Sequence, residues 1–314
     1  MKRPNSPEAA TPSQPPDQNW APARTKPLRG QVALVAGATR GAGRAIAVSL
    51  ALAGATVYAS GRSVRGHPAT PGRPETIDET AEIIRSYGGR AYAVRTDHTV
   101  EAEVRRLVRG IARREHGRLD ILVNDIWGGE ELTEWGQPPW TMSYRLGRTM
   151  LERAVFSHIL TSRYAVPLMV KRKRGIVFEI TDGDHLEYRG SFFYDLVKST
   201  VIRLALAYHE EFVEAKLPRV NAVAVTPGFL RSEYMLDQFG VTEENWRDAA
   251  AKVRRFSASE TPYFLGRAIV ALATDPHVHA KSGKVFGSWT LAKEYGFTDR
   301  NGTRPDWGKA FREG

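Results

Sequence analysis

The sequence predicts one doubly wound α/β domain, a mostly parallel sheet of seven strands covered by helices on both faces. Short apolar runs alternate with amphipathic helical runs along most of the 314 residues, which is the pattern of a parallel sheet. The alternation continues without an internal repeat, so we assign residues 29–314 to a single domain. A hydrophobic content of 42% is enough to fill the core of such a domain.

The expected elements follow one another in a regular order. The strands are short apolar runs, at residues 31–36, 55–60, 91–95, 120–124, 175–180, 220–225 and 284–288. The helices between them are expected at residues 41–53, 75–87, 101–115, 148–170, 191–215 and 262–274. Gly88 and Gly89 follow the second helix, where glycine commonly ends a helix. Residues 127–150 and 229–259 interrupt the alternation, and we interpret both segments as insertions.

The first 28 residues have a different character from the rest of the chain. They are rich in proline and lack apolar periodicity, so we expect a disordered tail at 1–28. The sequence has no cysteine, which excludes disulfides and thiolate catalysis. We find neither a signal sequence nor an apolar run of the ~20 residues that a membrane span needs. These observations predict a cytoplasmic protein without a membrane partner.

The net charge of +10 raises the question of a nucleic-acid partner. Basic residues are spread over many expected helices and are mixed with acids. The one dense run, residues 171–174, falls in a turn before the strand at 175–180, where solvent exposure explains it. We therefore predict a protein that binds an anionic cofactor and no nucleic acid.

A glycine turn follows the first strand. Gly37, Gly41 and Gly43 lie between the apolar run 32–36 and a helix-forming run. Backbone N–H groups and the helix dipole make such a helix start a binding site for phosphate. Glycine lets the backbone approach the ligand closely. This pattern predicts a dinucleotide phosphate site, although three glycines after a strand are weak evidence by themselves.

A tyrosine and a lysine lie four residues apart on the expected helix 191–215. Tyr194 and Lys198 therefore share one helix face. A phenol with a reference pKa near ~10 is a poor acid-base catalyst at neutral pH, and a neighbouring ammonium lowers that pKa. The spacing predicts an acid-base pair, but an ordinary amphipathic helix can carry the same two residues.

The two motifs in combination resemble the short-chain dehydrogenase/reductase family. That family carries Thr-Gly-x-x-x-Gly-x-Gly near its start and Tyr-x-x-x-Lys later, and here Ala36 replaces the threonine. The apolar run 119–124 and Thr226-Pro227-Gly228 fall where the family has its next motifs. Three further segments are similar to the member-1-like branch of dehydrogenase/reductases, at 75–81, 282–285 and 291–296.

The resemblance implies a Rossmann-type domain that transfers a hydride between a nicotinamide cofactor and a small carbonyl or alcohol substrate. Tyr194 would be the general acid or base, and Lys198 would also hold the nicotinamide ribose. Asp97 would contact the adenine, and Asn124 would steady the central strand near the cofactor. Family members often form homo-oligomers, and the two insertions leave this open here. We assign no metal site.

Ser232 has two interpretations. It lies five residues after Pro227, which matches the family's threonine that holds the nicotinamide carboxamide. It also precedes Glu233 at the start of a short helical run, where serine is a common N-cap.

The end of the second strand predicts NADP(H) as the cofactor. A site for NAD usually has an acid there, which binds the ribose 2′-hydroxyl. This chain has Arg62 and no acid, and a guanidinium can pair with a 2′-phosphate. Arg40 and Thr39 lie in the glycine turn, and Arg40 is placed to reach the same phosphate. Two solvent-exposed arginines are the competing interpretation.

Three family features near the reacting atoms are changed. The serine that polarises the substrate carbonyl is replaced by Thr181 or Asp182, and we favour Thr181 because it keeps a hydroxyl. An ionised Asp182 would repel a developing oxyanion. Ala154 falls near the place of the assisting asparagine, and residues 125–127, Asp-Ile-Trp, replace Asn-Ala-Gly.

These changes keep a second function class open. The leading hypothesis is an NADP(H)-dependent oxidoreductase with Tyr194, Lys198 and Thr181 as catalytic residues. The alternative is a protein that binds NADP(H) with weak or no catalysis and acts as a sensor or structural partner.

Overall fold

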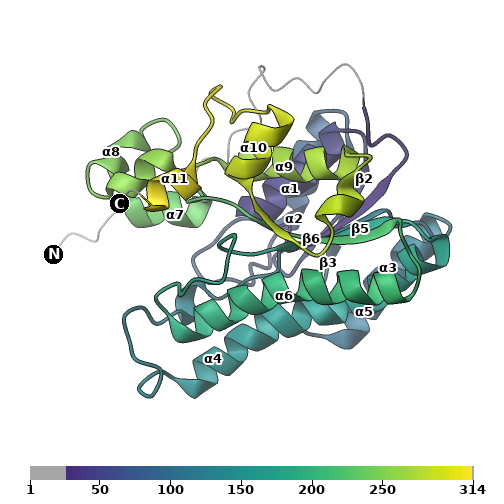
Figure 1. Cartoon of the computed structure of the whole chain (residues 1–314), viewed down its shortest axis with the longest axis horizontal. Helices are drawn as coiled ribbons and strands as arrows, with labels where there is room; N and C mark the ends of the chain where they lie inside the picture. The colour runs from purple at the N-terminus through teal and green to yellow at the C-terminus, as the bar shows by residue number, and fades with distance from the viewer. Residues whose placement is uncertain (1–25, 313–314) are drawn as a thin grey trace.

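The computed structural model describes residues 26–312, and a seven-stranded sheet lies at their centre (Figure 1). The strand order is β3-β2-β1-β4-β5-β6-β7, and all neighbouring strands are parallel. The strands are β1 Val32–Ala36, β2 Thr56–Gly61, β3 Arg90–Arg95, β4 Ile121–Asn124, β5 Gly175–Ile180, β6 Val220–Thr226 and β7 Val285–Gly287. This confirms the predicted fold class. The order reverses between β1 and β4, and doubly wound sheets bind ligands beside such a reversal, outside the carboxyl ends of the strands.

Helices cover both faces of the sheet (Figure 1). One layer contains α1 Gly41–Leu52, α2 Ile77–Ser86, α9 Pro262–Thr274 and α10 Ser288–Tyr295, and the other contains α3 Glu101–Arg114, α5 Ser157–Arg172 and α6 Phe192–Glu214. Successive residues of β1 enter opposite layers, with Ala33 and Val35 in one core and Val32 and Leu34 in the other. Burial on both faces explains why the strands read as nearly continuous apolar runs.

The helix before β5 begins earlier than the expected residue 148. It consists of α4 Tyr144–Leu151, a single π-helical turn at Glu152–Phe156, and α5. Ala154, near the place of the family's asparagine, lies in this π turn and is buried. A π turn in a long helix is a local irregularity that often occurs at a functional site.

The second insertion forms a small helical unit. It contains α7 Glu233–Phe239, α8 Arg247–Ala250 and a 3-10 turn at Arg254–Ala258, and it packs around Trp246 and Phe256. Phe229 and Trp307 of helix α11 Trp307–Arg312 lie ring against ring, so α11 packs on this unit. Neither α10 nor α11 was predicted.

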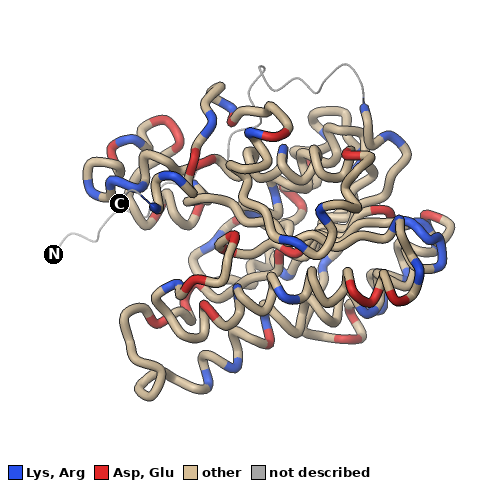
Figure 2. Tube along the Cα trace, in the orientation of Figure 1, with Lys and Arg blue, Asp and Glu red and all other residues tan. Residues whose placement is uncertain are grey.

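Most of the predicted tail, residues 1–25, lies outside the described residues. Leu28, within that predicted tail, is fully buried, and its N–H donates to the carbonyl of Ala53. Of the helices between residues 26 and 312, none is long and apolar enough to cross a membrane. Lys and Arg residues are spread over the elements with Asp and Glu residues among them (Figure 2).

Candidate active site

The glycine turn lies between β1 and α1, at the reversal of strand order. Gly37 has a φ of +96°, and a Cβ on it would come within 2.3 Å of the carbonyl oxygen of Asp125. A Cβ on Gly43 would come within 2.3 Å of the carbonyl oxygen of Gly37. Both neighbours are backbone atoms, so neither can move aside without moving a strand end. These glycines are therefore required by the packing of the turn against itself and against β4, before any ligand is considered.

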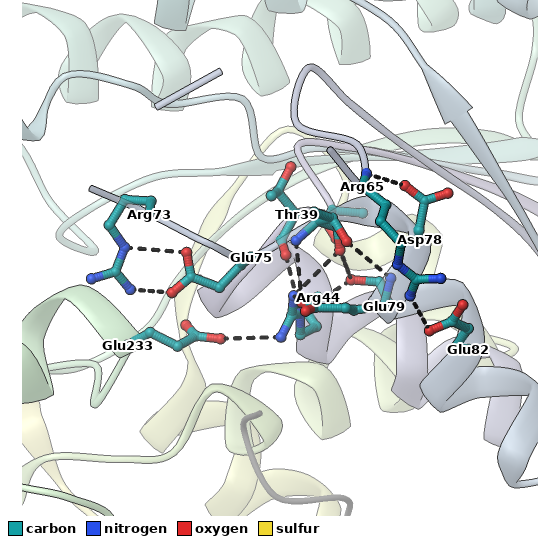
Figure 3. A network of polar contacts seen from close by, with 12 residues as sticks. Thr39, Arg44, Arg65, Arg73, Glu75, Asp78, Glu79, Glu82 and Glu233 are labelled. Atoms are coloured by element: carbon teal, nitrogen blue, oxygen red, sulfur yellow. Dashed lines mark hydrogen bonds and ion pairs between the residues drawn. The ribbon is translucent and has the colours of Figure 1, made fainter. Parts of the chain in front are cut away.

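A carboxylate of this chain binds the start of α1. The N–H of Gly41 donates to Glu233 Oε2 at 2.8 Å, and Glu233 Oε1 lies 3.7 Å from the Arg44 guanidinium (Figure 3). Glu233 is the first residue of α7. A helix N-terminus with free N–H groups is where a dinucleotide phosphate binds. No pattern in the sequence indicates this contact, because the two residues are 192 positions apart.

Ion pairs connect α7 to the loop before α2. Arg44 is almost fully buried and donates to the Thr39 carbonyl and to Glu79 of α2 (Figure 3). Arg73, in the loop before α2, pairs with both Glu75 and Asp237 of α7. The glycine turn, α2 and α7 thus form one polar network around the start of α1.

Ser232 is the N-cap of α7. Its hydroxyl accepts a hydrogen bond from the Met235 N–H at 3.3 Å, which is the capping interaction considered above. The Cβ of Ser232 also lies 3.5 Å from the position that a Cβ of Gly41 would occupy. Ser232 is therefore beside the glycine turn as well.

The end of β2 carries no acid. Ser60 is buried, and its hydroxyl meets the Val35 carbonyl at 3.2 Å and His98 Nε2 at 2.9 Å. The Thr39 hydroxyl lies 2.5 Å from where a Cβ of Gly61 would be, so the turn packs closely on this strand end. Arg62 and Arg40 are both partly buried and flank these positions in the chain.

Asp97 and Arg62 influence each other electrostatically at this edge. Burial raises the pKa of Asp97, but hydrogen bonds from Thr99 and the charge of Arg62 outweigh burial, and the pKa is lowered overall. The Asp97 carboxylate accepts from the Thr99 N–H at 3.0 Å and from the Thr99 hydroxyl at 2.7 Å.

Tyr194 and Lys198 lie one turn apart in α6, close to the bounds expected for that helix. Lys198 Nζ lies 5.4 Å from the centroid of the Tyr194 ring, which confirms that the two side chains share a face. The Tyr194 hydroxyl donates to Asp182 Oδ2 at 2.8 Å. Asp182 comes two residues after the end of β5, so the strand end and the helix bring these groups together.

The pKa of Tyr194 differs from the expected direction. Burial raises it well above its usual range, and the charge of Asp182 and the hydrogen bond to Asp182 raise it further. Burial lowers the pKa of Lys198, while the charges of Asp182 and Asp125 oppose that change. The lysine was expected to lower the pKa of Tyr194. The reason for the difference is that the phenol is partly desolvated and its hydrogen-bond partner is a carboxylate.

Thr181 does not face Tyr194. It is 3% exposed, and its hydroxyl donates to the backbone carbonyl of Lys198 at 2.7 Å. The residue that meets the Tyr194 hydroxyl is Asp182. The side chain in contact with Tyr194 is therefore the carboxylate of Asp182, and the threonine hydroxyl secures α6 to β5.

Two tryptophans pack against Tyr194. Trp127 meets it edge to face with ring centroids 5.5 Å apart, and Trp135 meets it at 5.1 Å with a 50° tilt. Lys198 Nζ lies 4.2 Å from the centroid of the Trp127 ring. The insertion after β4 therefore supplies an aromatic wall at the position where the family has a small residue.

A buried polar network lies beneath this wall. Asn124 donates to Glu179 Oε1 at 2.9 Å and to the Ser162 hydroxyl at 3.0 Å. The Nδ1 atom of His158 lies 2.7 Å from the other carboxylate oxygen of Glu179. Its Nε2 atom lies 3.0 Å from the carbonyl oxygen of Ile126. Asn124 thus ties β4 to β5 and α5. Sequence reasoning missed His158 and Glu179, although a glutamate within the apolar run 175–180 was an available signal.

Asp125 lies between the glycine turn and Lys198 of α6. Its Oδ2 is 2.8 Å from where a Cβ of Gly43 would be, and the Gly43 N–H bonds to its carboxylate. Desolvation raises the pKa of Asp125 to about 7, while the charges of Lys198 and His158 act in the opposite direction. The Asp125 carboxyl group therefore interacts both with the glycine turn and with Lys198.

Comparisons with known proteins agree on one family. The family model described as short chain dehydrogenase matches residues 31–239. Dehydrogenase/reductase SDR family member 1 of Mus musculus is 34% identical over 280 residues, covering 88% of this chain and 85% of that protein.

Solved structures share the fold. A hydroxysteroid dehydrogenase from Escherichia coli has a TM-score of 0.65 at 25% identity, covering 83% of this chain and 97% of that one. A second structure is a candidate NAD(P)-dependent gluconate 5-dehydrogenase from Beutenbergia cavernae, with bound NADP at low occupancy. It has a TM-score of 0.65 at 24% identity, covering 83% of this chain and 96% of that one.

Proposed function

The chain belongs to the short-chain dehydrogenase/reductase family of NAD(P)-dependent oxidoreductases, and from this premise we propose that it transfers a hydride between NADP(H) and a carbonyl or alcohol substrate. The observation that carries the proposal is the meeting of two motifs in space. Asp125 accepts the Gly43 N–H of the glycine turn and lies in the field of Lys198, so the phosphate turn and the acid-base pair belong to one site.

The residues present fit a dinucleotide. Gly37 and Gly43 leave no room for a side chain, and the start of α1 already binds an anionic group of this chain. The end of β2 offers Arg62 in place of an acid, which favours a 2′-phosphate over a free 2′-hydroxyl. Arg40 and Arg62 would hold that phosphate, Asp97 the adenine, and Lys198 the nicotinamide ribose.

Each catalytic side chain has a separate task. When bound, the nicotinamide supplies or takes the hydride. Tyr194 gives its hydroxyl proton to the substrate oxygen during reduction and takes it back during oxidation. Asp182 accepts a hydrogen bond from that hydroxyl and fixes its direction, while Thr181 donates to the Lys198 carbonyl and secures the helix that carries the pair. Trp127 and Trp135 shield the group from water and offer apolar surface to the substrate.

The alternative, a protein that binds NADP(H) with weak catalysis, rests on the raised pKa of Tyr194 and on the alanine at position 154. A raised pKa keeps the phenol protonated, which suits a general acid in reduction. We therefore favour an enzyme that works in the direction of reduction. A cytoplasmic location and homo-oligomers remain predictions.

A screen of aldehydes and ketones with NADPH, followed by absorbance, tests the proposal. We expect NADPH consumption with at least one aromatic carbonyl compound and a much slower rate with NADH at equal concentration. Tight NADPH binding without turnover of any substrate would favour the binding-protein alternative. No binding of either cofactor would refute both.

A further inference from the structure

The substrate side of the site ends in a hydrogen-bond acceptor. In the family, a serine hydroxyl donates to the substrate oxygen, but here Asp182 takes that place. Asp182 Oδ2 accepts the Tyr194 hydroxyl at 2.8 Å. Its other oxygen, Oδ1, has no hydrogen-bond donor within residues 26–312. An ionised carboxylate can only accept, so the ligand atom that satisfies Oδ1 must carry a proton.

Acids outnumber bases around this group. The charges of Asp182, Asp125 and Glu130 all act on Lys198. The other nearby base, Arg189, is paired with Asp195 at 3.0 Å. A substrate oxygen that gains negative charge would meet a surplus of negative charge here. A cationic group of a substrate would instead be attracted by these carboxylates.

The aromatic side chains independently suit a cation. The Trp127 ring already has one ammonium, that of Lys198, 4.2 Å from its centroid. Trp135 packs on Tyr194 and is 58% exposed, so part of its surface remains open to a ligand. Indole faces attract cations through their quadrupole, and most strongly where water is excluded. A carboxylate flanked by indoles is a common arrangement for recognising a charged nitrogen.

We propose that the preferred substrate is a protonated carbon–nitrogen double bond, in an apolar or aromatic cyclic imine, whose N–H binds Asp182 Oδ1 beside Trp127 and Trp135. The inference rests on the proposed hydride transfer and replaces the carbonyl by its nitrogen analogue. Hydride from NADPH forms the new C–H bond at the iminium carbon. The π pair of the C=N bond becomes the lone pair of the neutral amine, and NADPH is oxidised to NADP⁺. The nitrogen already carries its proton, so no proton transfer is needed in this step.

Matched substrates test the inference. Dihydroisoquinoline is the imine probe, and tetralone is a ketone of the same bicyclic size. For the unmodified protein we expect kcat/KM to be at least about tenfold higher for the imine, the value of one charge-assisted contact. Asp182→Ser restores a hydroxyl donor and should reverse the preference. Asp182→Asn keeps the shape without the charge and should lose the preference for the imine.

The control is Asp184→Asn, a nearby acid that pairs with His185 instead of Tyr194. This variant should keep the substrate preference. Calorimetry without turnover provides a second readout. Tetrahydroisoquinoline, the amine product, should bind the unmodified protein about tenfold more tightly than it binds Asp182→Asn, whereas tetralol should bind both equally.

The outcomes separate this inference from the proposed function. The inference would be overturned if tetralone were reduced faster than dihydroisoquinoline and if Asp182→Ser and Asp182→Asn left that preference for the ketone unchanged. The proposed hydride transfer would still stand. Equal amine affinity in the unmodified protein and Asp182→Asn would also overturn it. NADPH binding with no turnover of either probe, in the unmodified protein and in Asp182→Ser, would count against both.

Discussion

The glycine turn and the catalytic end of α6 preserve the family pattern to different degrees. The turn has its glycines at 37, 41 and 43, and the backbone around them leaves no room for another residue. At α6, Tyr194 and Lys198 are present, but their neighbours Asp182 and Trp127 are not those of the family. The part proposed to bind the cofactor is thus held by backbone packing. The part proposed to meet the substrate is built from side chains, which can change without moving the fold.

The largest effect should come from the turn. Gly43→Val would press a side chain against the Gly37 carbonyl and Asp125, so the turn must open. We expect NADPH affinity to fall by more than about 100-fold, roughly 3 kcal/mol, as measured by calorimetry. Gly110→Val, at a helical glycine with no neighbour near its Cβ position, is the control and should bind normally. Normal binding by Gly43→Val would show that the turn does not hold the cofactor.

Arg62 tests the cofactor choice at the same end. Arg62→Ala removes a guanidinium placed to meet a 2′-phosphate, so NADPH binding should weaken by about 1–3 kcal/mol. NADH binding should hardly change, because NADH has no such phosphate. Calorimetric titrations with both cofactors decide this, and equal losses for the two would refute the assignment to NADP(H).

Asp125 tests the junction between the two regions through pH. Its pKa of about 7 in the folded protein exceeds its ordinary value of 3.8, so the unfolded chain releases this proton first as pH rises. The free energy of unfolding should therefore decrease between about pH 4 and about pH 7. Asp125→Asn should remove a decrease on the order of 4 kcal/mol, since about three pKa units separate the two values at ~1.36 kcal/mol each. Urea titrations across this range measure it.

Glu260 provides the matched comparison for Asp125. Its pKa is also raised by burial, to about 8, but its hydrogen-bond donors are Ser288 and the Gly228 N–H, neither of which belongs to the glycine turn. Glu260→Gln should alter the pH profile of stability up to about pH 8 and leave the contribution of Asp125 in place. A profile unchanged by Asp125→Asn would show that the carboxyl group is not desolvated as described.

The smallest effect is expected at Glu233. Its carboxylate accepts the Gly41 N–H of α1 at the place where a pyrophosphate would bind, so the two anions compete. Glu233→Gln should tighten NADPH binding about threefold to tenfold, or up to ~1.4 kcal/mol. Asp237→Asn changes a carboxylate on the same helix that pairs with Arg73, and should have less effect. Weaker binding by Glu233→Gln would mean that Glu233 assists the cofactor.

Prediction from sequence worked where the signal is local. The bounds expected for α6, 191–215, nearly match Phe192–Glu214, because apolar spacing along one helix is visible in the chain. That Tyr194 and Lys198 share one face of this helix follows from helical geometry alone. The π turn at Glu152–Phe156 and the short helices α10 and α11 were missed, because their stability depends on tertiary packing.

The site was less predictable than the fold. Thr181 and Asp182 were both recognised, but which of them faces Tyr194 depends on how the chain turns after β5. The contact of Glu233 with Gly41 joins two distant segments and leaves no pattern in the sequence. The raised pKa of Tyr194 arises from desolvation and a carboxylate partner, which the Tyr-x-x-x-Lys spacing does not encode.

Turnover of the Tyr194→Phe variant tests the central claim, that Tyr194 transfers the proton in a hydride-transfer reaction. The change removes only the hydroxyl that donates to Asp182, so folding and NADPH affinity should stay the same. With the best carbonyl substrate of the screen, we predict that kcat falls by at least the ~10²-fold typical of a lost acid-base group. Full turnover by Tyr194→Phe, with NADPH bound as tightly as before, would contradict the mechanism.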